Sequence, residues 1–595
     1  MKQHLVSALV AIALVLLTGC GGNFLPGDSG KATSQGVIFI SKQAPLVVSF
    51  LTSWFQSQPQ VEEALKVFLG KQDLDYQKDI QPWLGSEITL AVTDLDFDHE
   101  PSNGVQPGYL LIATTKDEAK SRQFLQTWLS QKLISGTELT FAPYKGTQLI
   151  YPQVVNSENL VDAASGDVVR NNPVMGDSAS TLVNNPTNTF ASTVVSGRSS
   201  VAEPYRFVLI ANHPQVLRQA INNAQAVDLN LANSLLLRKA NANSYQKTMG
   251  SLEQSGLGWG FINLPAVTAW LGKHGELTQE PPFASLAIAL SPQNQGLIAK
   301  TALLTSNLEA NLESNPDNDP NSPNLITTNP ATNYLPASSG LAISGTNLQK
   351  FLAEYVATPD KSNLTESNLL ASNVGNLLKQ VDKELQINFS QDMLPWLTGD
   401  YALGWLPNQE AKTNKGNANS GDWLFITDRS APEAPAAIAH LDQLAIKQGF
   451  SITPLKLAQQ PVTLWTQLQA KTNKQGLKDV DTLVRGVHAQ VENYEIFASS
   501  IGAIGTALGI GSQPLPTYKQ FQGAIAPLAI PNQGYLYLDW PTARPWLESQ
   551  FPLLRFLEVP LAPLLGDLET LSFTTYGSKA GITSSELFFN FQKSE

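Results

Sequence analysis

Short apolar runs rich in β-branched residues alternate with longer amphipathic segments along most of this chain. Runs of the first kind predict buried strands, because strands are short and favour such side chains. Lys116–Leu133 instead spaces Phe124 and Trp128 four residues apart, as on one helix face. Along the chain, a predicted strand neighbours another strand or a hairpin as often as it neighbours a helix, which favours an antiparallel α+β fold. The strands predicted in the first half are Pro45–Leu51, Ile88–Val92, Gly108–Thr114, Leu139–Tyr144, Thr147–Tyr151, Phe207–Ala211, Leu257–Asn263, Ser285–Ser291 and Gly296–Leu304.

This succession of patterns occurs twice. The stretch Pro82-Trp83-Leu84-Gly85 returns as Pro395-Trp396-Leu397-Thr398-Gly399, and neighbouring landmarks return in the same order. Such order at a long period indicates an internal duplication. The sequence therefore predicts two tandem copies of an antiparallel-sheet-plus-helices domain, at 37–305 and 334–595. The other matched pairs are Phe39-Ile40 with Tyr334-Leu335, Leu46–Ser49 with Leu341–Ser344, Tyr109–Ile112 with Trp423–Ile426, and Phe261–Pro265 with Tyr537–Pro541.

Two polar segments interrupt the pattern. Residues 152–203 are dominated by Asn, Ser, Thr, Asp and Gly, which predicts a disordered insertion in the first copy. Residues 306–333 are rich in Asn, Pro and Asp, which predicts a solvated, extended linker between the copies.

The first 36 residues contain a predicted targeting signal. Leu5–Leu17 is apolar but shorter than the about 20 residues that a membrane span needs. It ends in Leu17-Thr18-Gly19-Cys20, which resembles a bacterial lipobox. The resemblance implies a lipoprotein signal peptide at 1–19, acylation of Cys20, and a flexible tether at 20–36. An ordinary secretory signal with an incidental Cys, or an uncleaved anchor, is the alternative. Cys20 is the only Cys, so the chain can form no internal disulfide.

Composition limits the partners. With a net charge of −12, the chain lacks the basic field that nucleic-acid binding requires. A hydrophobic content of 42% excludes a wholly disordered chain. The expected partners are a membrane, through acylated Cys20, and a protein.

An acidic cluster is the most suggestive chemical feature. Asp94, Asp96 and Asp98 alternate like the opening of a calcium loop, because hard cations take several oxygen ligands. The pattern then fails, since His99 stands at the glycine position and Val105 replaces the bidentate Glu. The alternative is a solvated acidic turn, so the three aspartates are retained only as candidate metal ligands.

Other motifs favour structural roles. Glu87 and Asp400 follow the repeated Trp and could act as acid and base, but a position at a strand's solvent edge is favoured. Trp83 and Trp396 are expected in the core. Gly502–Gly511 lacks a phosphate-loop spacing and predicts a closely packed helix of small residues. No histidine pair has HExxH spacing, no G-x-S-x-G elbow occurs, and no catalytic or cofactor-binding residue is assigned.

The tether, the strands that open the copies, the Pro-Trp-Leu-Gly motif and the Asn/Asp-x-Pro step together resemble the cyanobacterial "domain of unknown function 3352" family. The strand openings are Ala44–Val48 and Pro336–Leu341. The resemblance covers about 37–591 and implies a cyanobacterial envelope or thylakoid-lumen setting, but it supplies no catalytic residues.

We therefore expect a lipid-anchored extracytoplasmic protein, on the periplasmic side, the outer membrane's inner face or in the thylakoid lumen. We expect it to bind a partner or act as a scaffold and not to catalyse a reaction. The alternatives are a small-molecule or lipid-binding module, and a hydrolase whose site is assembled from dispersed carboxylates.

Overall fold

The computed structural model describes a subset of the 595 residues. The predicted signal peptide, Cys20, most of the tether and most of the two polar segments lie outside it. The described residues are 34–52, 66, 69, 74–100, 104–133, 137–154, 190–197, 205–226, 229–232, 244–252, 256–271, 283–293, 295–306, 325–349, 389–407, 421–472, 478–550, 566–579 and 581–591.

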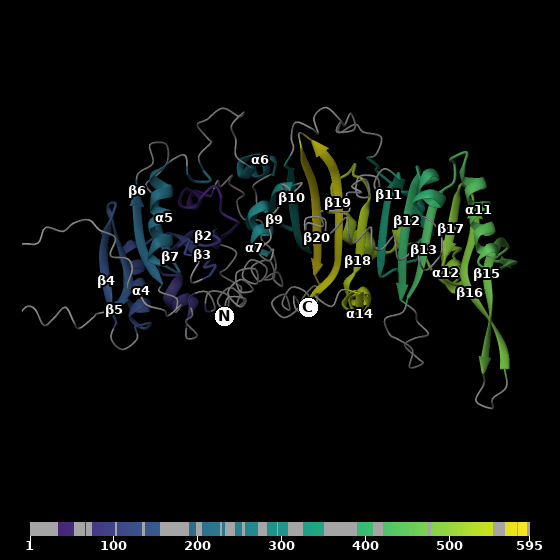
Figure 1. Ribbon diagram of the computed structural model, residues 1–595, viewed down its shortest axis with the longest axis horizontal. Coiled ribbons are helices and arrows are strands. Elements are labelled where there is room, and N and C mark those ends of the chain that lie inside the picture. The colour runs from purple at the N-terminus through teal and green to yellow at the C-terminus, as the bar shows by residue number, and fades with distance from the viewer. Residues whose placement is uncertain are drawn as a thin grey trace, which may run out of the picture. The chain divides into compact units, whose positions relative to one another are not determined.

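The chain forms two units. The N-terminal unit comprises Lys31–Lys247 and Leu257–Trp270, and the C-terminal unit comprises Thr248–Gly256 and the chain from Leu271 onward. In the N-terminal unit the described strands pair antiparallel in the order β8-β1-β2-β3-β7-β6-β5-β4 (Figure 1). They are β1 (Leu46–Leu51), β2 (Leu84–Asp94), β3 (Gly108–Thr115), β4 (Thr137–Tyr144), β5 (Thr147–Val154), β6 (Ala191–Gly197), β7 (Tyr205–Ala211) and β8 (Gly258–Asn263).

The C-terminal unit contains a longer antiparallel sheet. Its described strands pair in the order β9-β10-β20-β19-β18-β11-β12-β13-β17-β16-β15-β14 (Figure 1). They are β9 (Phe283–Gln293), β10 (Gly296–Thr305), β11 (Leu341–Thr346), β12 (Asp400–Pro407), β13 (Gly421–Asp428), β14 (Ser451–Leu457), β15 (Gln460–Thr472), β16 (Lys478–Val491), β17 (Tyr494–Ala498), β18 (Tyr535–Asp539), β19 (Leu568–Lys579) and β20 (Ile582–Phe591). The predicted antiparallel α+β class is confirmed.

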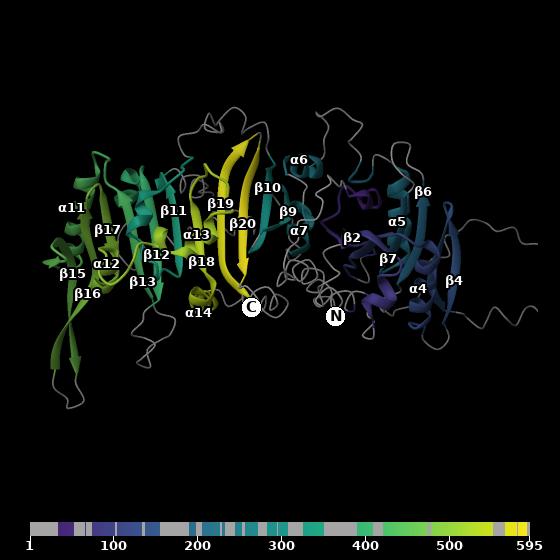
Figure 2. The ribbon, with the colours of Figure 1, turned by 180° about the vertical axis from the view of Figure 1, so that it is seen from behind.

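Helices pack on these sheets. α4 contacts β5 and β6, α5 contacts β3, β6 and β7, and α13 lies on β18, β19 and β20 (Figure 2). Asp117 caps α4 by accepting a hydrogen bond from Lys120 N at 3.0 Å. The helices are η1 (Gln35–Phe39), η2 (Tyr76–Ile80), α4 (Glu118–Ser130), α5 (Pro214–Gln225), α6 (Ser244–Ser251), α7 (Leu264–Leu271), η8 (Pro330–Tyr334), η10 (Phe389–Met393), η11 (Leu394–Trp396), α11 (Ala434–Lys447), α12 (Ile501–Ala507), η13 (Leu515–Thr517), α13 (Lys519–Ile525) and α14 (Trp540–Gln550).

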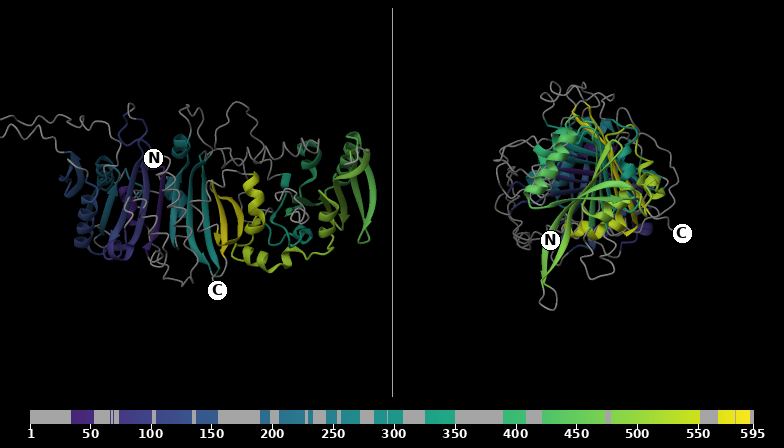
Figure 3. Two further views of the ribbon diagram at one scale, coloured as in Figure 1. Left: turned by 90° about the horizontal axis from the view of Figure 1, so that it is seen from below. Right: turned by 90° about the vertical axis from the view of Figure 1, so that its right-hand side faces the viewer.

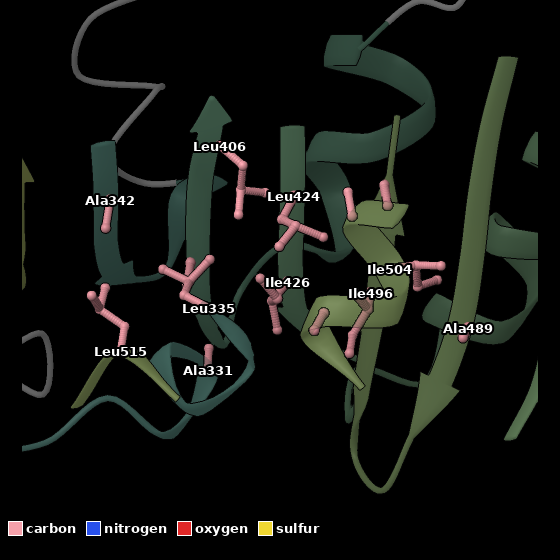
Figure 4. Close-up of a cluster of buried hydrophobic side chains, with 14 of the residues drawn as sticks. Ala331, Leu335, Ala342, Leu406, Leu424, Ile426, Ala489, Ile496, Ile504 and Leu515 are labelled. Carbon is pink, nitrogen blue, oxygen red and sulfur yellow. The ribbon is translucent and has the colours of Figure 1, made fainter. Parts of the chain in front are cut away.

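Both faces of the C-terminal sheet are covered. Leu424 and Ile426 of β13 belong to a core with Ile504 of α12 (Figure 4), and α13 contributes Phe521 and Ala524 to the same core. Phe425, between them, packs into a second core with Ile438 and Leu441 of α11. Because successive residues of a strand face opposite sides, α11 and α12 lie on opposite faces of the sheet. This explains why the strand is a continuous apolar run.

The two repeated tryptophans are core residues, as predicted. Trp83 is 3% exposed and Trp396 is 1% exposed. Each indole nitrogen donates to a backbone carbonyl four residues earlier, at 2.7 Å to Asp79 and 3.3 Å to Asp392. The buried ring therefore leaves no polar atom unsatisfied.

The predicted domain limits need correction. The hairpin β9–β10 is encoded before the predicted linker, yet it belongs to the C-terminal unit, where β10 pairs with β20. The insertion predicted at 152–203 contains β6, which pairs with β7 over its whole length. A polar, β-branched strand of this kind is hard to recognise because its composition resembles that of a loop.

The predicted linker and tether also reach into folded structure. Residues 325–333 include Asn329 and Ala331, which are 5% and 0% exposed. The Asn329 amide donates to Gly345 O at 2.8 Å and Tyr401 O at 3.2 Å, which satisfies it inside the core. Ser34 precedes η1, residues 35 and 36 are its first residues, and all three belong to the N-terminal unit. The solvated interpretation is therefore wrong for these residues.

Candidate binding site and buried ionic network

A cavity of about 420 Å³ lies in the N-terminal unit, within the range typical of small-molecule sites. Its walls come from the loop before β1, the end of β2, one face of α5 and the first turn of α7. The lining residues are Ser41, Gln43, Pro45, Thr93, Asp94, Leu95, Val216, Gln219, Ala220, Asn223 and Ala266.

Helix α5 contributes both buried apolar residues and polar groups to the lining of the cavity. Val216 and Ala220 are buried, at 0% and 1% exposed. Gln219 and Asn223 share that helix face because the four positions follow a spacing of three and four residues. The helix begins there because His213 caps it, with Nδ1 accepting from Gln215 N at 3.2 Å, and Pro214 occupies its first turn.

Several polar groups of the lining remain available to a ligand. Asn223 Nδ2 donates to Phe39 O at 3.2 Å, and no described residue bonds its Oδ1. The Gln219 side chain makes no hydrogen bond within the described residues. Ser41 Oγ accepts from Gln43 N at 3.2 Å, which leaves the hydroxyl proton free to be donated.

The acidic turn predicted from the sequence borders this cavity through Asp94. Its aspartates accept backbone N–H groups: Asp94 Oδ1 from Asp96 N at 3.1 Å, and Asp96 Oδ1 from Gln106 N at 3.0 Å. Asp98 Oδ1 accepts from Glu100 N at 3.3 Å. In the part of the chain that the structure describes, no three His, Cys, Asp or Glu side chains are placed to hold a metal ion.

The second feature is a buried ionic network in the C-terminal unit. His488 Nδ1 lies 2.6 Å from Glu495 Oε1, and its Nε2 lies 3.1 Å from Asp442 Oδ1. Trp465 Nε1 donates to the same Asp442 oxygen at 2.7 Å, and Arg429 Nη1 donates to Glu495 Oε2 at 2.9 Å. Both ring nitrogens of His488 can donate only in the imidazolium form, so the geometry favours a charged ring.

Strand register creates this network. His488 of β16 pairs with Phe497 of β17, which places Glu495 diagonally across the same face. Asp442 reaches the ring from α11, which packs on that face. Burial lowers the pKa of His488, but the bonds to Glu495 and Asp442 and their negative charges outweigh it and raise the pKa above 6.5.

The network is closed to substrates. The His488 residue is 6% exposed, and its ring stacks on Phe497 with centroids 5.6 Å apart. Its nitrogen partners are the two carboxylates alone, and no hydroxyl nucleophile is among its described hydrogen bonds. The arrangement can hold charge and dock α11, whereas the cavity can admit a ligand.

Glu87 and Asp400 lie apart from both features, and neither occupies the solvent edge that was predicted. Each is half-buried on a strand with partners on both sides. Glu87 Oε1 accepts from the hydroxyls of Ser49 and Thr89. Burial, with the nearby Asp428 charge, raises the pKa of Asp400.

The remaining predictions have mixed outcomes. Gly502–Gly511 contains helix α12, whose Ala503, Ile504 and Ala507 are buried, so the packed-helix prediction is confirmed. Cys20 lies outside the described residues. Sequence reasoning missed the network around His488, because its members come from different elements and share no motif. The helical spacing of Gln219 and Asn223 was the available signal for the cavity.

The fold and these features define an α+β protein whose described strands pair antiparallel. The chain belongs to the family described as "Protein of unknown function (DUF3352)", whose model matches residues 5–591. No curated protein matches the chain.

Among solved structures, the chain is similar to crystal form I of TP0453, with 9% identity over 46% of this chain and 80% of that one. Crystal form III gives 8% identity over 46% and 81%. The TM-score is 0.21 in both comparisons, which is too low to establish a shared fold. Within the described residues, no helix combines the length and apolar character that a membrane span requires.

Proposed function

We propose that this chain is a lipid-anchored extracytoplasmic protein that binds a protein partner and acts as a scaffold. The lipobox-like Leu17–Cys20 supports the anchor, since acyl chains contribute about 0.8 kcal/mol per buried methylene. Membership of the DUF3352 family is compatible with the cyanobacterial envelope or thylakoid-lumen setting that the sequence suggested.

The observation that carries the binding role is a β-ribbon that extends beyond the C-terminal sheet (Figure 3). β14 pairs with β15 only as far as Thr466, and β17 pairs with β16 only from Val487. Beyond those points, β15 and β16 pair with each other alone among the described residues. Leu468 on this ribbon is 69% exposed. Unpaired edges beside an exposed apolar side chain suit the addition of a partner strand.

Leu468→Asp tests the ribbon. In an affinity pull-down from solubilised membranes, we expect the wild-type protein to recover one partner protein in stoichiometric amount and the Leu468→Asp variant to recover none. The variant should fold normally, because Leu468 is solvent-exposed. The matched control is Leu455→Asp, at a residue 38% exposed on edge strand β14. Equal recovery by wild type and both variants would exclude the ribbon as the docking surface.

Cys20→Ala should move the protein from the membrane to the soluble fraction, and membrane retention would contradict the anchor.

We also propose that the two units arose by duplication. The order β8-β1-β2-β3-β7-β6-β5-β4 in the N-terminal unit corresponds strand for strand to β18-β11-β12-β13-β17-β16-β15-β14 in the C-terminal unit. The correspondence supports the repeat inferred from the Pro-Trp-Leu motifs.

A second candidate function is small-molecule binding by the N-terminal unit. The cavity beside α5 favours it, because apolar side chains line it together with amide, hydroxyl and carboxylate groups.

A further inference from the structure

We infer that the cavity of the N-terminal unit binds a small organic cation that carries a primary ammonium group. The inference rests on the second candidate function and adds the ligand class. It follows from the charge, the hydrogen-bond acceptors and the apolar residues of the lining.

The charge of the lining is negative. Asp94 is the one carboxylate in it, and neither Lys nor Arg lines the cavity. Asp94 Oδ1 is engaged by the Asp96 N–H, while its Oδ2 has only the exposed His99 ring, at 3.8 Å, among the described basic groups within 4 Å. Oδ2 can therefore accept from a ligand, and an anionic ligand would be repelled.

The lining offers carbonyl oxygens beside Asp94. The single bond from Asn223 Nδ2 to Phe39 O leaves the Asn223 carbonyl oxygen without a described hydrogen bond. Gln219, which is free of described hydrogen bonds, adds a further carbonyl oxygen one helical turn away. The three donors of an ammonium group can be accepted by Asp94 Oδ2 and these two carbonyl oxygens, while its charge is paired by Asp94.

The apolar part of the lining suits a short methylene chain. Leu95 and Ala266 of the lining are partly exposed and contribute apolar surface to the cavity, whereas Val216 and Ala220 are buried, at 0% and 1% exposed. A four-carbon amine would place its chain against this surface and its charge at Asp94, so both parts of the ligand would be accommodated.

Calorimetric titration of the full processed chain with three four-carbon probes tests the inference. The probes are 4-amino-1-butanol, which carries one ammonium group, neutral 1,4-butanediol and anionic succinate, compared at one ionic strength because charge attraction is screened by salt. We expect one 4-amino-1-butanol per chain and no detectable binding of the other two. Asp94→Asn should weaken 4-amino-1-butanol binding by about tenfold or more, because it removes the paired charge but keeps an acceptor for Asp96 N. Gln219→Leu should weaken it by about threefold.

Asp98→Asn is the matched control, since Asp98 lies in the same turn but does not line the cavity. Equal losses in the Asp94 and Asp98 variants would mean a diffuse attraction to the negative chain and would overturn the inference. If 1,4-butanediol binds as tightly as 4-amino-1-butanol, and its binding is sensitive to Gln219→Leu, the cationic ligand class is overturned while small-molecule binding is preserved. Failure of all three probes would reject the amine site together with the second candidate function.

Discussion

At the scale of single residues, the most consequential feature is the placement of His488 between two carboxylates. Glu495 and Asp442 raise its pKa above the value of 6.5 that it has in the unfolded chain. A raised pKa means that the folded state binds the proton more tightly. The network therefore contributes its full stability below about pH 6.5 and loses it as the pH rises through the folded-state pKa.

His488→Gln should lower the free energy of unfolding of the C-terminal unit by about 3 kcal/mol at pH 6, because buried Glu495 then keeps only Arg429 as a cationic partner and Asp442 loses its own. The loss should be smaller at pH 9 than at pH 6, because the wild-type ring loses its proton as the pH rises through its raised pKa. Urea unfolding followed by tryptophan fluorescence at both pH values measures the difference. The control is His440→Gln, whose side chain is 45% exposed and 3.5 Å from Asp392; it should cost under about 0.5 kcal/mol. An equal loss at the two pH values would show that His488 acts only through packing.

At the scale of elements, η8 shows how a polar segment can be part of a core. Asn329 accepts from Ala331 N at 3.0 Å, which caps the helix, and donates to carbonyls of Gly345 on β11 and Tyr401 on β12. One amide thus joins a helix to two strands. The residue is 5% exposed, so its bonds have no competing water.

Asn329→Ala should destabilise the C-terminal unit by about 2 kcal/mol, because it removes the cap and leaves two buried carbonyls with one partner fewer. Chemical denaturation compares it with Asn493→Ala, at an exposed turn residue whose amide makes one long bond, 3.5 Å to Ser430. The control should be within about 0.5 kcal/mol of wild type. If the stability of Asn329→Ala is also within about 0.5 kcal/mol of wild type, η8 is held by apolar packing alone.

At the scale of the whole chain, the first half of the sequence supplies strands to the C-terminal unit. β10 pairs with β20 from Gly296↔Asn590 to Leu304↔Ile582, and β9 continues the sheet. Without this hairpin, β20 would be an edge strand with unpaired backbone groups and the apolar Ile298 contact to Phe588 would be lost.

A fragment of residues 325–595 should therefore self-associate more than a fragment of residues 283–595, because it exposes the edge of β20 and loses the contact of Phe588 with Ile298. Light scattering after size-exclusion chromatography distinguishes the two, and amide hydrogen exchange in β20 should be faster in the shorter fragment. Two monomeric fragments with equal protection of β20 would place the boundary at the predicted linker instead.

Local patterns predicted much of the secondary structure. The apolar runs around Val48 and Leu111 are β1 and β3, the helical spacing through Phe124 and Trp128 is α4, and the Lys145-Gly146 hairpin joins β4 and β5. Lys145 and Gly146 adopt positive φ values of 44° and 84°, as tight hairpin turns require. β6 was missed, since it lies in a polar segment and its identity depends on pairing with β7.

Periodicity and apolar anchors act over a few residues, so the antiparallel α+β class, the burial of Trp83 and Trp396 and the family could be predicted from the chain alone. Four features could be known only from the folded molecule: β10 joins the C-terminal unit, η8 is buried, Asp94 meets the face of α5, and His488 meets Asp442 and Glu495. Each of these depends on contacts between residues far apart in the chain. Strand register and helix docking set such contacts, and local composition carries no record of them.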